Sequence, residues 1–134
     1  MDVALTHHGD TRLLVATLSG RFSLEAAKYT FLRILEAAIQ GSARKVLVDG
    51  SAVTGEPRRI ERFYYGRFVA DAVVQACSRA NCAAPQFAYV LKPPVLDADR
   101  LGETVAVSHG MVVKAFDDLK DALSWLRLPT GNAA

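Results

Sequence analysis

The chain has few of the features that mark secreted, membrane or nucleic-acid-binding proteins. Only two of its 134 residues are cysteines, and no apolar run approaches the roughly 18 residues that a membrane-spanning helix needs. Its net charge is +2, and residues of both signs are scattered along the chain rather than gathered in a basic tail or stripe. Asp2 places an acidic side chain at the start of the sequence, whereas the first residues of a signal peptide are basic. We therefore expect a soluble, cytoplasmic protein with no membrane span and no nucleic-acid partner.

The sequence also lacks the motifs that identify common classes of enzyme. It contains no Gly-x-Ser-x-Gly nucleophile elbow, no Gly-x-Gly-x-x-Gly turn and no Walker-type Gly-Lys-Ser loop. His7 and His8 are adjacent, and neighbours in a strand point to opposite faces, so they do not form a chelating pair. Cys77 and Cys82 are spaced to lie on different faces of a helix, which suits neither a metal pair nor a disulfide. We predict free thiols, no metal site and no cofactor.

The length and the apolar fraction of the chain, 51%, are sufficient for one buried core without disulfide or metal support. Apolar periodicity predicts strands at 3–8, 12–18, 46–48, 87–91 and 111–116, and helices at 24–40, 57–80, 96–107 and 117–126. The first two strands would form a hairpin, and Ser23 is a good N-cap. The order indicates an α/β domain in which the hairpin joins a mixed, mostly parallel five-stranded sheet with about four helices. We expect one domain over residues 1–128 and a flexible tail at 129–134.

Several runs of residues together resemble the SpoIIAA-like (STAS/Sec14-type) domain family of bacteria. The most specific are Lys-Val-Leu-Val-Asp at 45–49 and a closing Phe-Asp-Asp at 116–118 with Ala-Leu-Ser-Trp-Leu at 122–126. The resemblance covers nearly the whole chain. It implies a small α/β domain without known catalytic machinery that regulates through protein partners, and its likeness to lipid-carrying Sec14-type domains makes an apolar ligand a second option.

The first candidate site is the segment 49–57, where the predicted strand stops at an acidic residue and small, hydroxyl-bearing residues follow. Functional groups gather at this edge of an open α/β sheet. In signalling members of the family, a serine directly before a glycine at the following helix N-terminus is phosphorylated, and here Thr54 directly precedes Gly55. Asp49, Ser51, Thr54 and Gly55 are therefore a candidate phosphoacceptor or anion-site loop. Alternatively, these side chains make turns and cap helix ends.

The second candidate site is the helix that follows, which is rich in arginine and aromatic residues. These residues would form an interaction surface for a protein partner or for a second copy of the chain: Arg58, Arg59, Arg62, Tyr64, Tyr65 and Phe68. Two other interpretations stay open. The arginines would then form a solvated charged face, and the aromatic rings would turn into the core.

Three functional hypotheses follow from these observations. The first is a non-enzymatic STAS-like interaction or regulatory domain that uses both candidate sites. The second is a carrier of a small apolar or lipid-like ligand, held between the aromatic helix and the helix at 96–107, with Pro93 and Pro94 as a gate. The third is an enzyme that uses Asp49 or His109, although neither lies in a recognisable catalytic motif.

Overall fold

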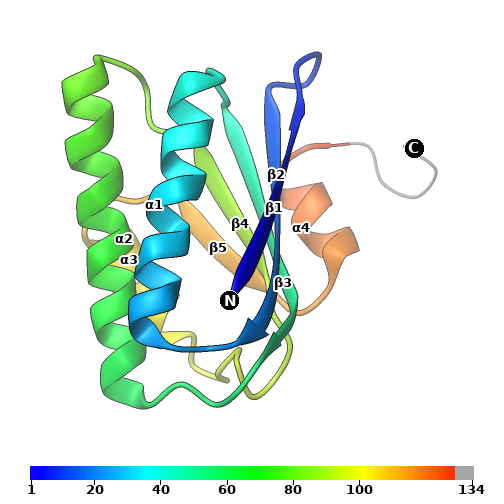
Figure 1. Ribbon diagram of the computed structural model, residues 1–134, viewed down its shortest axis with the longest axis vertical. Coiled ribbons are helices and arrows are strands. Elements are labelled where there is room, and N and C mark those ends of the chain that lie inside the picture. The colour runs from blue at the N-terminus through cyan, green and yellow to red at the C-terminus, as the bar shows by residue number, and fades with distance from the viewer. Residues whose placement is uncertain (129–134) are drawn as a thin grey trace.

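A five-stranded sheet lies at the centre of the computed structural model, which describes residues 1–128 (Figure 1). Its strands are β1 (Asp2–His8), β2 (Leu13–Arg21), β3 (Lys45–Thr54), β4 (Gln86–Val90) and β5 (Val113–Phe116), and they lie in the order β1-β2-β3-β4-β5. β1 is antiparallel to β2, and the other pairs are parallel. The predicted hairpin and mixed sheet are confirmed. The expected tail at 129–134 lies outside the described residues.

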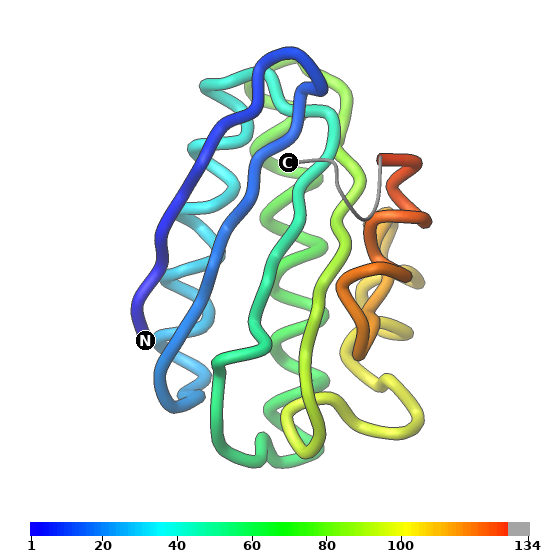
Figure 2. Tube along the Cα trace, turned by 90° about the vertical axis from the view of Figure 1, so that its right-hand side faces the viewer, coloured from blue at the N-terminus to red at the C-terminus, as the bar shows by residue number. Residues whose placement is uncertain are grey.

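Four helices complete the described part of the chain: α1 (Leu24–Gln40), α2 (Arg59–Ala80), α3 (Leu101–Ser108) and α4 (Leu119–Trp125). α1, α2 and α3 each connect two neighbouring parallel strands, so crossovers of one hand place them on the same face of the sheet. α4 packs against β4 and β5 from the other face (Figures 1 and 2). No helix within residues 1–128 is both long enough and apolar enough to cross a membrane.

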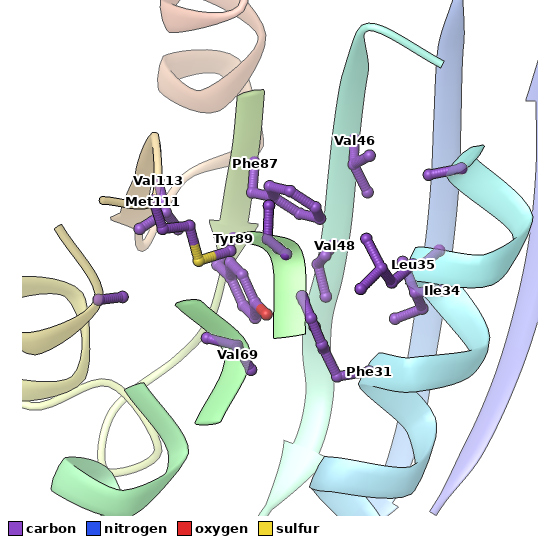
Figure 3. Packing of buried hydrophobic residues seen from close by; sticks show 14 of the residues in the cluster. Phe31, Ile34, Leu35, Val46, Val48, Val69, Phe87, Tyr89, Met111 and Val113 are labelled. Atoms are coloured by element: carbon purple, nitrogen blue, oxygen red, sulfur yellow. The ribbon is translucent and has the colours of Figure 1, made fainter. Parts of the chain in front are cut away.

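Two apolar clusters, one on each face of the sheet, form the core. The alternation along β3 assigns Val46 and Val48 to the larger cluster, beneath α1 and α2, and Leu47 to the smaller cluster, beneath α4. Figure 3 shows part of the larger cluster, in which Phe31 from α1 and Phe87 from β4 pack with ring centroids 5.6 Å apart. The central strand is therefore buried on both faces, as its apolar run predicts.

Side-chain caps fix the starts of the helices. The Ser23 hydroxyl accepts a hydrogen bond from the Ala26 amide at 3.2 Å, which confirms the predicted cap of α1. α3 begins at Leu101, five residues later than predicted. Its amide donates to the Asp97 carboxylate at 3.0 Å, and Arg100 has a φ of 50°, a left-handed conformation that interrupts any helix before it.

α2 and α3 approach each other unusually closely at two glycines. A Cβ atom built on Gly66 would lie 2.4 Å from the carbonyl oxygen of Gly102, a separation that real Cβ atoms do not show. The absence of a side chain at Gly66 therefore lets the two helix backbones touch.

The outer edge of β5 is covered by two side chains near the start of α3. Glu103 accepts a hydrogen bond from the amide of Ala115 at 2.7 Å, and Arg100 donates to the carbonyl oxygen of the same residue at 3.1 Å. The amide and the carbonyl oxygen of Ala115, which both point away from β4, are therefore both hydrogen-bonded within the chain.

Candidate functional site

The segment predicted as a loop after Asp49 is a continuation of strand β3, which runs on to Thr54. Between the pairs Thr17↔Asp49 and Ser19↔Ala52, β2 advances by two residues and β3 by three, so β3 contains a bulge. The Asp49 carboxylate accepts hydrogen bonds from the Ser51 amide at 3.1 Å and the Ser51 hydroxyl at 2.7 Å. The Asp-Gly-Ser sequence thus bends the strand locally rather than ending it, and the predicted loop is wrong for residues 49–54.

Thr54 lies at the exposed end of β3 and not at the start of the next helix. Its carbonyl oxygen accepts a hydrogen bond from the Phe22 amide at 2.8 Å, and Gly55 follows with a φ of 106°. α2 begins only at Arg59, and the residue at its N-cap position is Arg58. Within residues 1–128, no hydrogen bond joins the Thr54 side chain to Arg58 or Arg59. The structure leaves the Thr54 hydroxyl accessible, but it does not bring it to a helix N-terminus.

The first arginines of α2 are held by nearby carboxylates. The Glu61 carboxylate accepts the Arg58 amide at 2.8 Å, and this hydrogen bond lowers the pKa of Glu61. Arg59 lies 2.8 Å from the Asp99 carboxylate, and this hydrogen bond lowers the pKa of Asp99. Both guanidinium groups remain largely exposed, with side-chain exposures of 76% for Arg58 and 69% for Arg59.

Arg62 differs from these two arginines because its side chain is 12% exposed. Its guanidinium donates to the carbonyl oxygens of Pro94, at 2.8 Å, and Val95, and it lies 3.4 Å from the Asp97 carboxylate. Arg62 therefore attaches the segment 93–97, which follows β4, to the side of α2. It belongs to the interior and not to the exposed interaction surface predicted from the sequence.

The aromatic residues of α2 likewise include both exposed and inward-facing side chains. Tyr64 is 50% exposed, and its ring meets Phe63 edge to face at 5.7 Å. Tyr65 points inward, and Phe68 is half-buried beneath the Lys28 ammonium group, 5.3 Å from the ring centroid. Of the six residues predicted for the interaction surface, Arg58, Arg59 and Tyr64 are exposed on α2, whereas Arg62, Tyr65 and Phe68 face the fold. Ile60, which the sequence analysis did not select, adds an apolar side chain that is 47% exposed.

A cavity of about 130 Å³ lies between the sheet and the helices α1, α2 and α3. Its lining is almost entirely apolar and includes Phe31, Val69, Val95, Leu96 and Val113. Figure 3 shows Tyr89 of β4 reaching into this region, with its hydroxyl between Val69 of α2 and Phe31 of α1. The predicted ligand site lies between the aromatic helix and the helix at 96–107. Residues of α2 and of the segment 95–106 do line this cavity, and ligand binding there stays a prediction.

Two tyrosine hydroxyls meet at this cavity. The hydroxyl oxygens of Tyr65 and Tyr89 are 2.8 Å apart, and both residues line the cavity. Burial raises the pKa of Tyr65 to about 12 and raises the pKa of Tyr89 well above its usual value. Both hydroxyl groups therefore keep their protons and stay neutral throughout the physiological pH range.

The segment 93–99 covers one end of the cavity and is attached to α2 by side-chain contacts. Val95 and Leu96 are buried and line the cavity, while Arg62 and Arg59 hold the segment through its carbonyl oxygens and through Asp97 and Asp99. We call this segment the lid. The prediction named Pro93 and Pro94 as a gate, and Val95 and Leu96, which line the cavity, come directly after them.

The residues considered for catalysis or metal binding do not assemble into a site. His109 lies at the end of α3, where its Nδ1 atom is 2.9 Å from the carbonyl oxygen of Val105, and the Asp49 carboxylate is engaged by Ser51. No cluster of three or more histidine, cysteine, aspartate or glutamate side chains within residues 1–128 could hold a metal ion.

The two cysteines are free thiols at the end of α2. Asn81 adopts a left-handed conformation, φ 53°, which ends α2 and lets the Cys82 amide donate to the Cys77 carbonyl oxygen at 3.0 Å. Burial, assisted by the Cys82 thiol, raises the pKa of Cys77 to about 11. Cys77 is buried and Cys82 is exposed.

Sequence reasoning missed Tyr89 and Asp97 as site residues. A tyrosine inside an otherwise apolar strand was an available signal, because a buried hydroxyl needs a partner. Asp97 was identifiable as the acidic cap of a helix that starts later than its apolar pattern indicates.

Comparison with known proteins supports the fold. No protein-family model and no curated protein sequence matches the chain. Its fold is similar to that in the crystal structure of an anti-sigma factor antagonist from Mycobacterium paratuberculosis, with a TM-score of 0.56 and 17% sequence identity over 94% of this chain and 93% of that one. The chain therefore has the SpoIIAA-like, STAS-type fold that its sequence resembles.

Proposed function

We propose that this chain is a non-enzymatic regulatory domain that acts in the bacterial cytoplasm by binding another protein through the start of α2. The observation that carries the proposal is an exposed, mixed surface on a fold shared with a protein named for its action on a protein partner. The surface consists of Arg58, Arg59, Ile60 and Tyr64, and we call it the α2 surface.

The composition of the α2 surface indicates the kind of partner. Ile60 is 47% and Tyr64 50% exposed, so both would gain from apolar burial, and tyrosine and arginine are the residues most often found at the energetic centres of interfaces. Arg58 and Arg59 add positive charge that is only partly offset by Glu61 and Asp99. A partner with an apolar groove bordered by carboxylates fits this surface. Such a partner is a different protein or, if the groove lies on the same fold, a second copy of the chain.

Thr54 is the residue through which this contact would be regulated. It is exposed and lies four residues before Arg58 in the sequence. A phosphoryl group there would add nearly two negative charges beside the α2 surface and would repel an acidic partner. Asp49, Ser51 and Gly55 would act indirectly, because they shape the strand and turn that present Thr54.

The test compares two aromatic truncations that differ in position. Tyr64→Ala removes a ring from the α2 surface, whereas Tyr29→Ala removes a ring that is 66% exposed on α1. A partner is first captured and identified with the wild-type chain, and its affinity for each variant is then measured by calorimetry. We expect Tyr64→Ala to weaken binding by roughly thirtyfold and Tyr29→Ala to leave it unchanged. Equal affinities for the two variants would reject the α2 surface. Sedimentation of the chain alone reports whether the partner is a second copy.

A second candidate function, binding of a small apolar ligand, is favoured by the cavity beneath the lid. An empty apolar space of about 130 Å³ sacrifices packing contacts that a filled core would make. Native mass spectrometry of the protein purified from its own cells tests this function, because a carrier would retain a ligand of constant mass. A single species at the mass of the bare chain, together with no binding of added apolar molecules, would reject it.

A further inference from the structure

The cavity between the sheet and α2 contains one more hydrogen-bond donor than the fold satisfies. We propose that it binds a small, neutral molecule with an apolar body and one acceptor oxygen, which the Tyr65 and Tyr89 hydroxyl pair holds. This inference rests on the second candidate function and specifies the class of ligand.

A count of protons at the hydroxyl pair supplies the first argument. The two oxygens are 2.8 Å apart, so one hydroxyl donates to the other and one proton is used. The proton of the accepting hydroxyl must point elsewhere, and no other hydrogen bond from either side chain occurs within residues 1–128. Because burial keeps both groups protonated, this donor persists at physiological pH. A buried donor gains most from an acceptor that enters the cavity with the ligand.

The size of the cavity supplies the second argument. An apolar cavity of about 150 Å³ stays free of water and holds a molecule the size of benzene. The volume here is about 130 Å³, which suits a body of roughly six or seven non-hydrogen atoms.

The charged side chains at the cavity supply the third argument. Two of them are positive and two are negative, so the side chains of the lining carry no net charge. Arg62 is paired with Asp97, whereas Arg100 and Glu103 hydrogen-bond the peptide groups of Ala115. Burial of an unpaired ion costs far more than burial of a carbonyl group that receives a hydrogen bond. A neutral ligand fits the balance of side-chain charge in this lining.

The experiment uses two probe molecules of nearly the same shape, cyclohexanone and methylenecyclohexane, which differ in the acceptor oxygen. Their affinities are measured by NMR titration of the ¹⁵N-labelled full chain, in the wild type and in the variants Tyr65→Phe, Tyr89→Phe and the double variant. Either single variant leaves one hydroxyl proton in the cavity, so we expect both to keep the preference for the ketone. The double variant leaves none, and its ketone-to-alkene affinity ratio should fall by roughly fivefold to tenfold.

The outcomes separate this inference from the function on which it rests. If both probes bind and the affinity ratio is the same in the wild type and the double variant, the role of the hydroxyl pair is refuted while apolar binding stands. If neither probe causes shifts at residues that line the cavity, both the inference and the carrier function are refuted. The double variant is expected to fold, because loss of both partners of a buried hydrogen bond leaves no unpaired group.

Discussion

Gly66→Ala tests how closely the structure depends on the contact between α2 and α3. The new Cβ atom would lie 2.4 Å from the Gly102 carbonyl oxygen, whereas ordinary contacts begin near 3.4 Å, so the helices would have to separate by about 1 Å. Overpacking of this kind costs typically about 1–3 kcal/mol. Replacement of a glycine inside a helix returns roughly 0.5–1 kcal/mol. We expect a net loss of about 1 kcal/mol in the free energy of unfolding.

The matched control is Gly102→Ala, on the other side of the same contact. Its Cβ atom would lie 3.4 Å from the Arg62 carbonyl oxygen, an ordinary separation, so the gain in helix propensity should remain. Thermal unfolding should show a melting temperature about 3–5 °C lower for Gly66→Ala, and one unchanged or slightly higher for Gly102→Ala. Urea titration should give a lower midpoint for Gly66→Ala with the same slope. If Gly66→Ala were as stable as the wild type, the close approach of the two helices would be refuted.

Three further perturbations follow from the burial of particular side chains. Arg62→Ala should cost about 2–3 kcal/mol in urea unfolding, because it leaves the lid carbonyl oxygens and Asp97 without their partner; a loss below about 1 kcal/mol, the level of an exposed ion pair, would contradict its structural role. Tyr65 ionises near pH 10 in the unfolded chain and at about 12 in the fold, so its stabilising contribution is complete below pH 10 and is lost as the pH rises through 12. Variants with phenylalanine at 65 and 89 should therefore lose less stability than the wild type between about pH 10 and 12, the range between the unfolded and folded pKa values of Tyr65, and parallel losses would argue against burial. Iodoacetamide at neutral pH should modify Cys82 in the native protein and Cys77 only after denaturation, as read by peptide mass mapping, and equal labelling would place both thiols at the surface.

The order of strands and helices was predictable because local signals agreed with the tertiary fold. Ser23 caps α1 as expected, and the apolar run at 46–48 is buried on both faces of the sheet. These signals are strong because each depends on side chains within a few residues of one another.

The end of β3 was not predictable from the same signals. Asp49, Gly50 and Ser51 are typical of a turn, yet pairing with β2 and burial of Val53 extend the strand beyond them. The polar residues then form a bulge. Tertiary pairing outweighed local propensity, which is common in strands.

The sequence also did not show which side chains of α2 are exposed. This helix contacts α1 on one side and α3 on another. Its fully buried residues form one stripe at helical spacing, and none of the helix's aromatic residues is among them: Gly66, Val69, Ala70, Val73 and Cys77. Tyr64 and Tyr65 are adjacent and chemically identical, but one is half exposed and the other meets Tyr89 in the cavity. The cavity itself is a property of packing among distant segments, which no local pattern records.

The hydrogen bonds that Glu103 and Arg100 make to Ala115 limit how copies of this chain can associate through their sheets. A strand that approached β5 would have to displace a carboxylate and a guanidinium group already in place. The opposite edge, β1, pairs only with β2 among the described strands, so its outward backbone groups are available. A chain with one open edge can join one neighbour and then has no edge left. Strand pairing between copies is therefore favoured at β1 over β5, and pairing through β1 alone joins two molecules.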